Sequence, residues 1–122
     1  ILPVLQALYP NLDYKNSTFH IDHIYPKAKF TTKNKALHPD FLEEKNYLFN
    51  LQLLEGSENI SKKDADPDVW MREHFNNDAS KIDDYKSKNY IDASCTMQWS
   101  DFKTFKEKRS AYIRSALIQA FK

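Results

Sequence analysis

The sequence predicts a single, mostly helical α+β domain, and three observations predict it. Its 122 residues suit one compact domain, and 41% of them are hydrophobic, which is enough for a modest core. Two short runs have the composition of strands, TFHIDHI at 18–24 and NLQLL at 50–54. The rest of the chain carries breakers and capping residues that outline several helices.

Prolines and polar caps set the expected element boundaries. In chain order we expect a helix end at 1–9, a strand at 18–24, a basic loop at 27–38, a short helix at 40–48, a strand at 50–54, a helix from 56 to about 63, a helix from about 67, and a long helix at about 100–121. Pro10 and Pro26 should end the first helix and the first strand. Asp40, Ser57 and Ser100 are the expected N-caps, because short polar side chains accept hydrogen bonds from first-turn amides.

The closing helix is expected to pack on the domain through one stripe. Its apolar positions fall mostly on one face; they are Phe102, Phe105, Tyr112, Ile113, Ala116, Leu117 and Phe121. Residues 76–98, just before it, are polar and give no clear prediction. Trp70, Trp99 and Cys95 are expected to be buried packing residues.

Charge and cysteine content narrow the classes of protein to which this sequence could belong. The net charge is +1, but residues 1–63 sum to +1, residues 64–93 to −4 and residues 94–122 to +4. The basic end suits a polyanion, although a solvated lysine-rich helix face explains it equally well. The single cysteine excludes a disulfide framework and a paired-cysteine zinc knuckle. With no apolar run of membrane length and no visible signal peptide, we expect a cytoplasmic protein that has no membrane partner.

A set of polar residues is spaced as a candidate site. Asp22 and His23 end the first strand, Asn50 starts the second, and Asn59 and Lys62 lie on the helix that follows. Carboxylate and amide oxygens are hard ligands suited to Mg²⁺ or Mn²⁺, and a neighbouring histidine can take a proton from water. Adjacent strand residues point to opposite faces, so the strand should end or bulge near His23. Hydrolysis of a phosphodiester bond needs this combination of groups.

These residues, in this order, resemble the HNH endonuclease motif, a ββα-metal finger, over residues 19–63. The phrases FHIDHIYPKAKF and NLQLLEGSENISKKDADP, with the closing helix, are also similar to the nuclease half of GmrSD-like restriction proteins. The resemblance implies an HNH finger packed among helices, and a metal-dependent endonuclease that cleaves DNA in bacterial defence. It also implies an upstream ParB-like nucleotide-hydrolysing domain. Because Ile1 opens inside a helix-like run, we expect residues 1–122 to be a single nuclease domain from a larger protein.

Each motif residue has an expected role. His23 is the general base, Asp22 and Asn59 bind Mg²⁺ or Mn²⁺, and Asn50 orients the loop against the strand. Lys62 is expected either to contact a phosphate or simply to be solvated. A basic loop is expected to follow the DNA phosphate backbone or to be solvated; its lysines are Lys27, Lys29, Lys33 and Lys35.

Two other functions remain open from the sequence. One is a catalytically silent DNA-binding module on the same scaffold, which the intact set of Asp22, His23 and Asn59 disfavours. The other is a protein-interaction domain that docks through the closing amphipathic helix.

Overall fold

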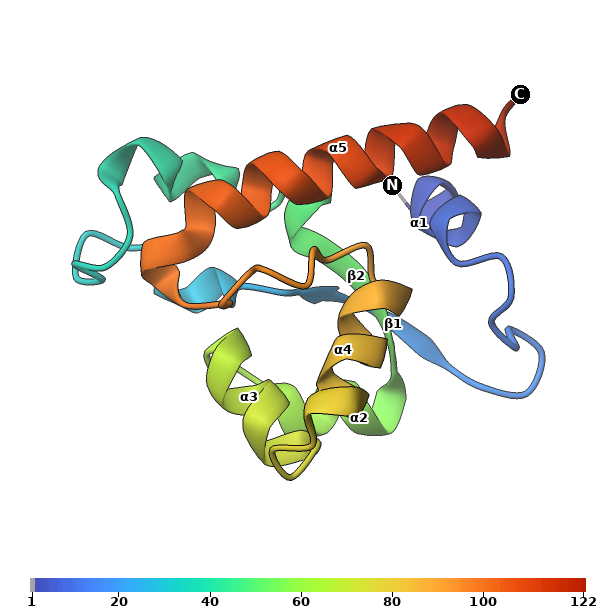
Figure 1. Ribbon diagram of the computed structural model, residues 1–122, viewed down its shortest axis with the longest axis horizontal. Helices are drawn as coiled ribbons and strands as arrows, with labels where there is room; N and C mark the ends of the chain where they lie inside the picture. The colour runs from blue at the N-terminus through green and yellow to red at the C-terminus, as the bar shows by residue number, and fades with distance from the viewer. Residues whose placement is uncertain (1) are drawn as a thin grey trace.

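A computed structural model describes residues 2–122, with the side chain of Ile60 left out of the description. Its elements are α1 (Leu2–Leu8), β1 (Phe19–His23), the 3₁₀ helices η1 (Lys27–Lys29), η2 (Pro39–Glu44) and η3 (Leu48–Asn50), β2 (Leu51–Glu55), α2 (Gly56–Lys62), α3 (Pro67–His74), α4 (Ala79–Lys88), η4 (Trp99–Asp101) and α5 (Phe102–Ala120) (Figure 1). This confirms the mostly helical α+β class. Within the described residues no helix has both the length and the apolar character needed to cross a membrane.

The two strands form one small antiparallel sheet. Asp22 lies opposite Gln52, and His23 lies opposite Leu51. The first strand ends at His23, close to the predicted position. Asp22 and His23 are still paired in regular register, so their side chains point to opposite faces of the sheet and are not brought together as the sequence analysis expected. The helix α2 follows β2 directly, and its first amide, that of Gly56, donates to the Thr18 carbonyl across 2.9 Å. In Figure 1 the sheet lies between α5 on one side and α2, α3 and α4 on the other.

Tyr25 anchors the end of the first strand in the larger of the two apolar clusters that the described residues form. Its ring is fully buried, and its centroid lies 4.9 Å from those of Trp99 and Phe105 in edge-to-face pairs. Its hydroxyl donates to the Gln98 carbonyl across 2.9 Å. Because Tyr25 follows His23 by two residues, this packing fixes the position of the strand end. The predicted burial of Trp70, Trp99 and Cys95 is confirmed.

All three expected helix caps are wrong, two of them for the same reason. The amide of Asp40 donates to the His38 side chain, so His38 caps a 3₁₀ helix where a longer helix was expected. The amide of Ser57 donates to the Glu55 carboxylate across 3.0 Å, so Glu55 caps α2. In both cases a longer side chain two residues upstream reaches the free amide, which the short-side-chain preference does not anticipate.

The polar segment 76–98 contains a helix that the sequence did not predict. Asp78 caps α4 by accepting from the Lys81 amide across 3.2 Å. Along α4 only Tyr85 and Lys86 are buried, so the hydrophobic pattern that marks a helix is almost absent. The expected cap at Ser100 is also wrong, because η4 occupies residues 99–101 and α5 begins at Phe102.

Arg109 replaces part of the apolar stripe predicted for α5. Tyr112 and Phe121 are 44% and 73% exposed, whereas Arg109 is fully buried. Its guanidinium donates to main-chain carbonyls on either side of Asn50, those of Leu48, Phe49 and Leu51 at 3.2, 2.7 and 2.8 Å. Burial lowers the pKa of Arg109. The closing helix therefore holds the segment that carries Asn50.

Candidate active site

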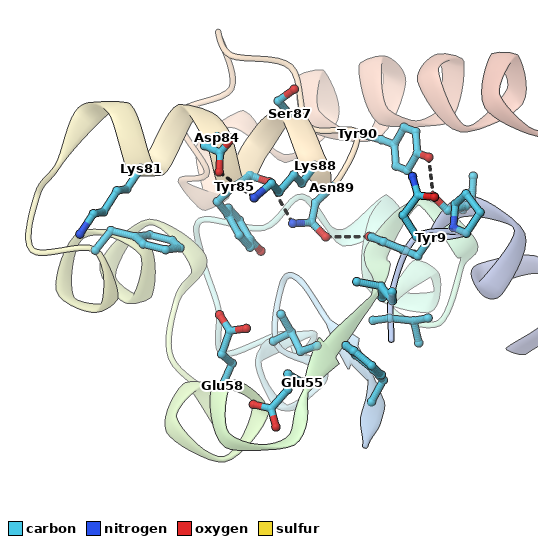
Figure 2. A pocket seen from close by; sticks show the side chains of 18 residues that line it. Tyr9, Glu55, Glu58, Lys81, Asp84, Tyr85, Ser87, Lys88, Asn89 and Tyr90 are labelled. Atoms are coloured by element: carbon cyan, nitrogen blue, oxygen red, sulfur yellow. Dashed lines mark hydrogen bonds and ion pairs between the residues drawn. The ribbon is translucent and has the colours of Figure 1, made fainter. Parts of the chain in front are cut away.

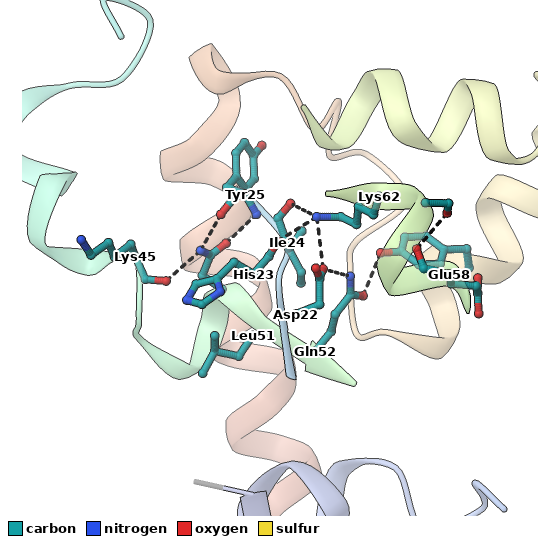
Figure 3. Close-up of polar contacts among 12 residues, drawn as sticks. Asp22, His23, Ile24, Tyr25, Lys45, Leu51, Gln52, Glu58 and Lys62 are labelled. Atoms are coloured by element: carbon teal, nitrogen blue, oxygen red, sulfur yellow. Dashed lines mark hydrogen bonds and ion pairs between the residues drawn. The ribbon is translucent and has the colours of Figure 1, made fainter. Parts of the chain in front are cut away.

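His23 stands at the end of β1 as a partly exposed side chain (Figure 3). Its Nε2 lies 2.7 Å from Oδ1 of Asn46. An amide oxygen only accepts hydrogen bonds, so Nε2 carries the proton in this contact and Nδ1 remains able to accept one. Sequence reasoning missed Asn46, because nothing in its local sequence distinguishes it from an ordinary loop asparagine.

Asn50 ties the chain just after His23 to the start of the second strand. Its side chain is fully buried. Its Oδ1 accepts from the Tyr25 amide across 2.8 Å, and its Nδ2 donates to the carbonyls of Tyr25 and Lys45 across 3.0 and 2.9 Å. These contacts account for the loop-orienting role that the sequence suggests for Asn50.

Replacing Asn50 with alanine should lower the free energy of unfolding by about 2–3 kcal/mol, because buried backbone groups of Tyr25 and Lys45 lose their partners. Urea unfolding measures the loss. Asn34→Ala is the control: its half-buried amide also bridges two backbone groups, at Lys29 and Ala36, and should cost no more than about 1 kcal/mol. Equal losses in the two variants would contradict the anchoring role of Asn50.

Asp22 lies in a buried polar network. Its carboxylate is nearly inaccessible, and Oδ2 accepts from Nε2 of Gln52 at 2.8 Å and faces Nζ of Lys62 at 3.1 Å (Figure 3). Both contacts use the same oxygen, so Oδ1 has no hydrogen-bond partner among the described residues. The contacts that the described residues make with the carboxylate therefore all fall on one oxygen, and the other is left for a further ligand.

The structure does not place Lys62 where the sequence analysis expected it. Lys62 is neither solvated nor directed outward toward a phosphate, because its side chain is buried. Besides Asp22, its ammonium group donates to the carbonyls of His23 and Ile24 across 2.8 and 3.1 Å. Burial lowers the pKa of Lys62, and the nearby Asp22 carboxylate opposes that shift. Lys62 thus compensates the buried charge of Asp22 and fastens the end of β1 to α2.

The network continues into α4. The hydroxyl of Tyr85 donates to Oε1 of Gln52 across 2.8 Å, and Tyr85 is itself buried. Burial raises the pKa of Tyr85. Neither Gln52 nor Tyr85 was predicted as a site residue. The strand register that brings Gln52 opposite Asp22 was the only available signal, and it requires the pairing of the two strands to be known.

The donors at this site fit a hydrated hard cation. Asn59 is half-buried on α2 and precedes Lys62 by three residues, so the two side chains share a helix face. In the described part of the chain no three His, Cys, Asp or Glu side chains gather to hold a metal ion. Two oxygen donors, from Asp22 and Asn59, suit Mg²⁺ or Mn²⁺, because these ions commonly keep several waters. They do not suit a zinc site of three or four protein ligands.

The basic loop is only partly available to a polyanion. Lys27, Lys33 and Lys35 are exposed. Lys29 instead binds Asp66, with its Nζ 2.8 Å from the carboxylate oxygen. Nothing near Lys29 in the sequence distinguishes it from the other three lysines, because Asp66 is distant along the chain.

A cavity of about 820 Å³ lies near the site but does not contain it (Figure 2). Side chains of β2, α4 and the segment after α1 line it, among them Leu53, Tyr85 and Tyr9. Of the motif residues Asp22, His23, Asn50, Asn59 and Lys62, none is among the described residues that line this cavity. Tyr85 is the residue that both lines the cavity and belongs to the Asp22 network.

Comparison with known proteins adds no family assignment. A scan of the chain against models of protein families finds no match, and a search of curated proteins finds no significant similarity. Function is therefore inferred from the residues of the site and from the resemblance of their order to a known motif.

Proposed function

We propose that this domain is a metal-dependent endonuclease of the HNH class that hydrolyses DNA phosphodiester bonds. The observation that carries the proposal is the position of His23. It ends the first strand, it is partly exposed, and its hydrogen bond to Asn46 leaves Nδ1 able to accept a proton. The adjacent Asp22 carboxylate and the order of β1, β2 and α2 support the same class.

The residues of the site have separate roles in the proposed reaction. His23 accepts a proton from the water that attacks phosphorus, while Asn50 and Tyr25 keep the strand end rigid beneath it. Asp22 and Asn59 supply oxygen ligands for Mg²⁺ or Mn²⁺. The bound ion would stabilise negative charge on the phosphate and on the leaving oxygen. Lys62 binds the Asp22 carboxylate and does not contact the phosphate.

One observation favours a second candidate, a DNA-binding module without catalysis. The Asp22 carboxylate already faces the Lys62 ammonium at 3.1 Å, which offsets the negative charge that would attract a divalent cation. In such a module the same surface would bind DNA, and the carboxylate would serve only to hold β1 against α2.

Cleavage of supercoiled plasmid separates the two functions. We expect nicked or linear DNA with Mg²⁺ or Mn²⁺, and no cleavage in excess EDTA, because the metal is required for charge stabilisation. In parallel, a gel-shift titration at low salt measures binding to the same DNA. Binding without cleavage under every metal condition would favour the silent module. Neither binding nor cleavage would contradict both, and would favour the protein-interaction domain.

The biological setting is proposed from the resemblance alone. In the GmrSD-like arrangement this domain would cut DNA selected by an upstream ParB-like nucleotide-hydrolysing domain, as part of cytoplasmic defence against foreign DNA. The lysines that could follow the DNA backbone act as point charges, which position a duplex without reading its sequence. Target choice would then come from the other domain.

A further inference from the structure

We infer that Gln52 and Tyr85 are positioning residues for Asp22, and that they orient its carboxylate so that Oδ1 is presented to the catalytic metal ion. The inference rests on the proposed function, because it concerns how that ion is held. It adds two residues that the motif does not include, one from β2 and one from α4.

The chain of hydrogen bonds is continuous and buried. The Tyr85 hydroxyl lies 2.8 Å from Oε1 of Gln52, and Nε2 of Gln52 lies 2.8 Å from Oδ2 of Asp22. Gln52 is fully buried, while Asp22 and Tyr85 are 7% and 8% exposed. Water therefore cannot readily replace the hydrogen bond between Gln52 and Asp22 if one of the two is removed.

The donors and acceptors allow only one arrangement of the Gln52 amide. An ionised Asp22 carboxylate only accepts hydrogen bonds, so the NH₂ end of Gln52 must face it. The opposite end of the amide then presents an oxygen, and the Tyr85 hydroxyl supplies its donor. Without that hydroxyl the amide keeps only its contact with Asp22 and loses the one that holds its opposite end.

The same arrangement selects one oxygen of Asp22. Gln52 and Lys62 both occupy Oδ2, one through an amide N–H and the other through an ammonium group. Rotation of the carboxylate would break both contacts at once. Oδ1 is thus held in one direction before any ion arrives, which is how partners behind a ligand raise metal affinity.

Mn²⁺ affinity of the whole 122-residue chain tests this inference, with matched tyrosine variants. Tyr85→Phe removes the hydroxyl that holds Gln52. Tyr9→Phe is the control, because Tyr9 is also 8% exposed and its hydroxyl also donates one buried hydrogen bond, to Oδ1 of Asn89 at 2.7 Å. The two substitutions should lower the melting temperature by similar amounts. Only Tyr85→Phe should weaken Mn²⁺ binding, by about 10-fold, within the 10–100-fold range of such residues.

Two further variants make the titration interpretable. Asn59→Ala removes a proposed ligand and should also weaken Mn²⁺ binding, which places the measured ion at this site. Gln52→Leu should weaken it more than Tyr85→Phe, up to about 100-fold, because it removes the direct contact with Asp22. Unchanged affinity in both Gln52→Leu and Tyr85→Phe, or equal weakening in Tyr85→Phe and Tyr9→Phe, would overturn the inference.

A second readout needs no metal. The side-chain amide resonances of Gln52 in the metal-free protein should shift in Tyr85→Phe and stay in place in Tyr9→Phe. If Gln52 does not respond to Tyr85→Phe, the relay is wrong whatever the nuclease assay shows. If Gln52 responds but the wild-type protein binds no Mn²⁺, the proposed metal-dependent function fails, and the metal-positioning role fails with it.

Discussion

Replacing His23 with alanine should lower the rate of DNA cleavage by about 10²–10⁴-fold, the usual loss when a general base is removed. The fold should change little. The His23 ring is partly exposed, and the hydrogen bond that it makes among the described residues joins it to the exposed side chain of Asn46. Single-turnover nicking of supercoiled plasmid gives the rate, and thermal melting reports on the fold.

His20 provides a matched control for His23. It lies on the same strand, three residues earlier, and is exposed. His20→Ala should cleave at close to the wild-type rate, because His20 is away from the strand end. Near-normal turnover in His23→Ala, or an equal loss in His20→Ala, would remove His23 from the role of base.

Much of the fold was predictable where the local signal was strong. The strand end near His23 follows from the proline at 26. The expected convergence of Asp22 and His23 is not observed, because both residues stay in the regular register of the sheet. The helix from Pro67 follows from the preference of proline for a first helical turn. The helix α4 was not predictable, because its sequence ASKIDDYKSK is polar nearly all round and α4 is held by burial of Tyr85 and Lys86.

The site was predictable only as far as its residue types carry chemistry. Asp22, His23 and Asn50 stand out because ionisable or amide side chains interrupt strand-like runs. Lys62 was misjudged because a lysine on a helix is normally solvated, and only the packing of α2 on β1 shows that this one meets a carboxylate. Gln52 and Tyr85 were not predicted as site residues for the same reason, because their partners come from other elements.

The second large effect is expected at Lys62. Lys62→Met should lower the free energy of unfolding by about 3–5 kcal/mol, because it leaves the buried Asp22 carboxylate without its compensating charge. The carbonyls of His23 and Ile24 lose a donor in the same change. Urea unfolding should show a lower midpoint with an unchanged slope, as for a change in stability alone.

Lys86→Met is the control, because Lys86 is also buried but donates to the Ala93 and Cys95 carbonyls. It should cost less than Lys62→Met, about 1–3 kcal/mol, since no charge is left unpaired. In an Asp22→Asn background the cost of Lys62→Met should shrink, because the residue opposite is then neutral. A cost for Lys62→Met below about 1 kcal/mol, the value of an exposed ion pair, would mean that Lys62 does not hold Asp22 in a buried pair.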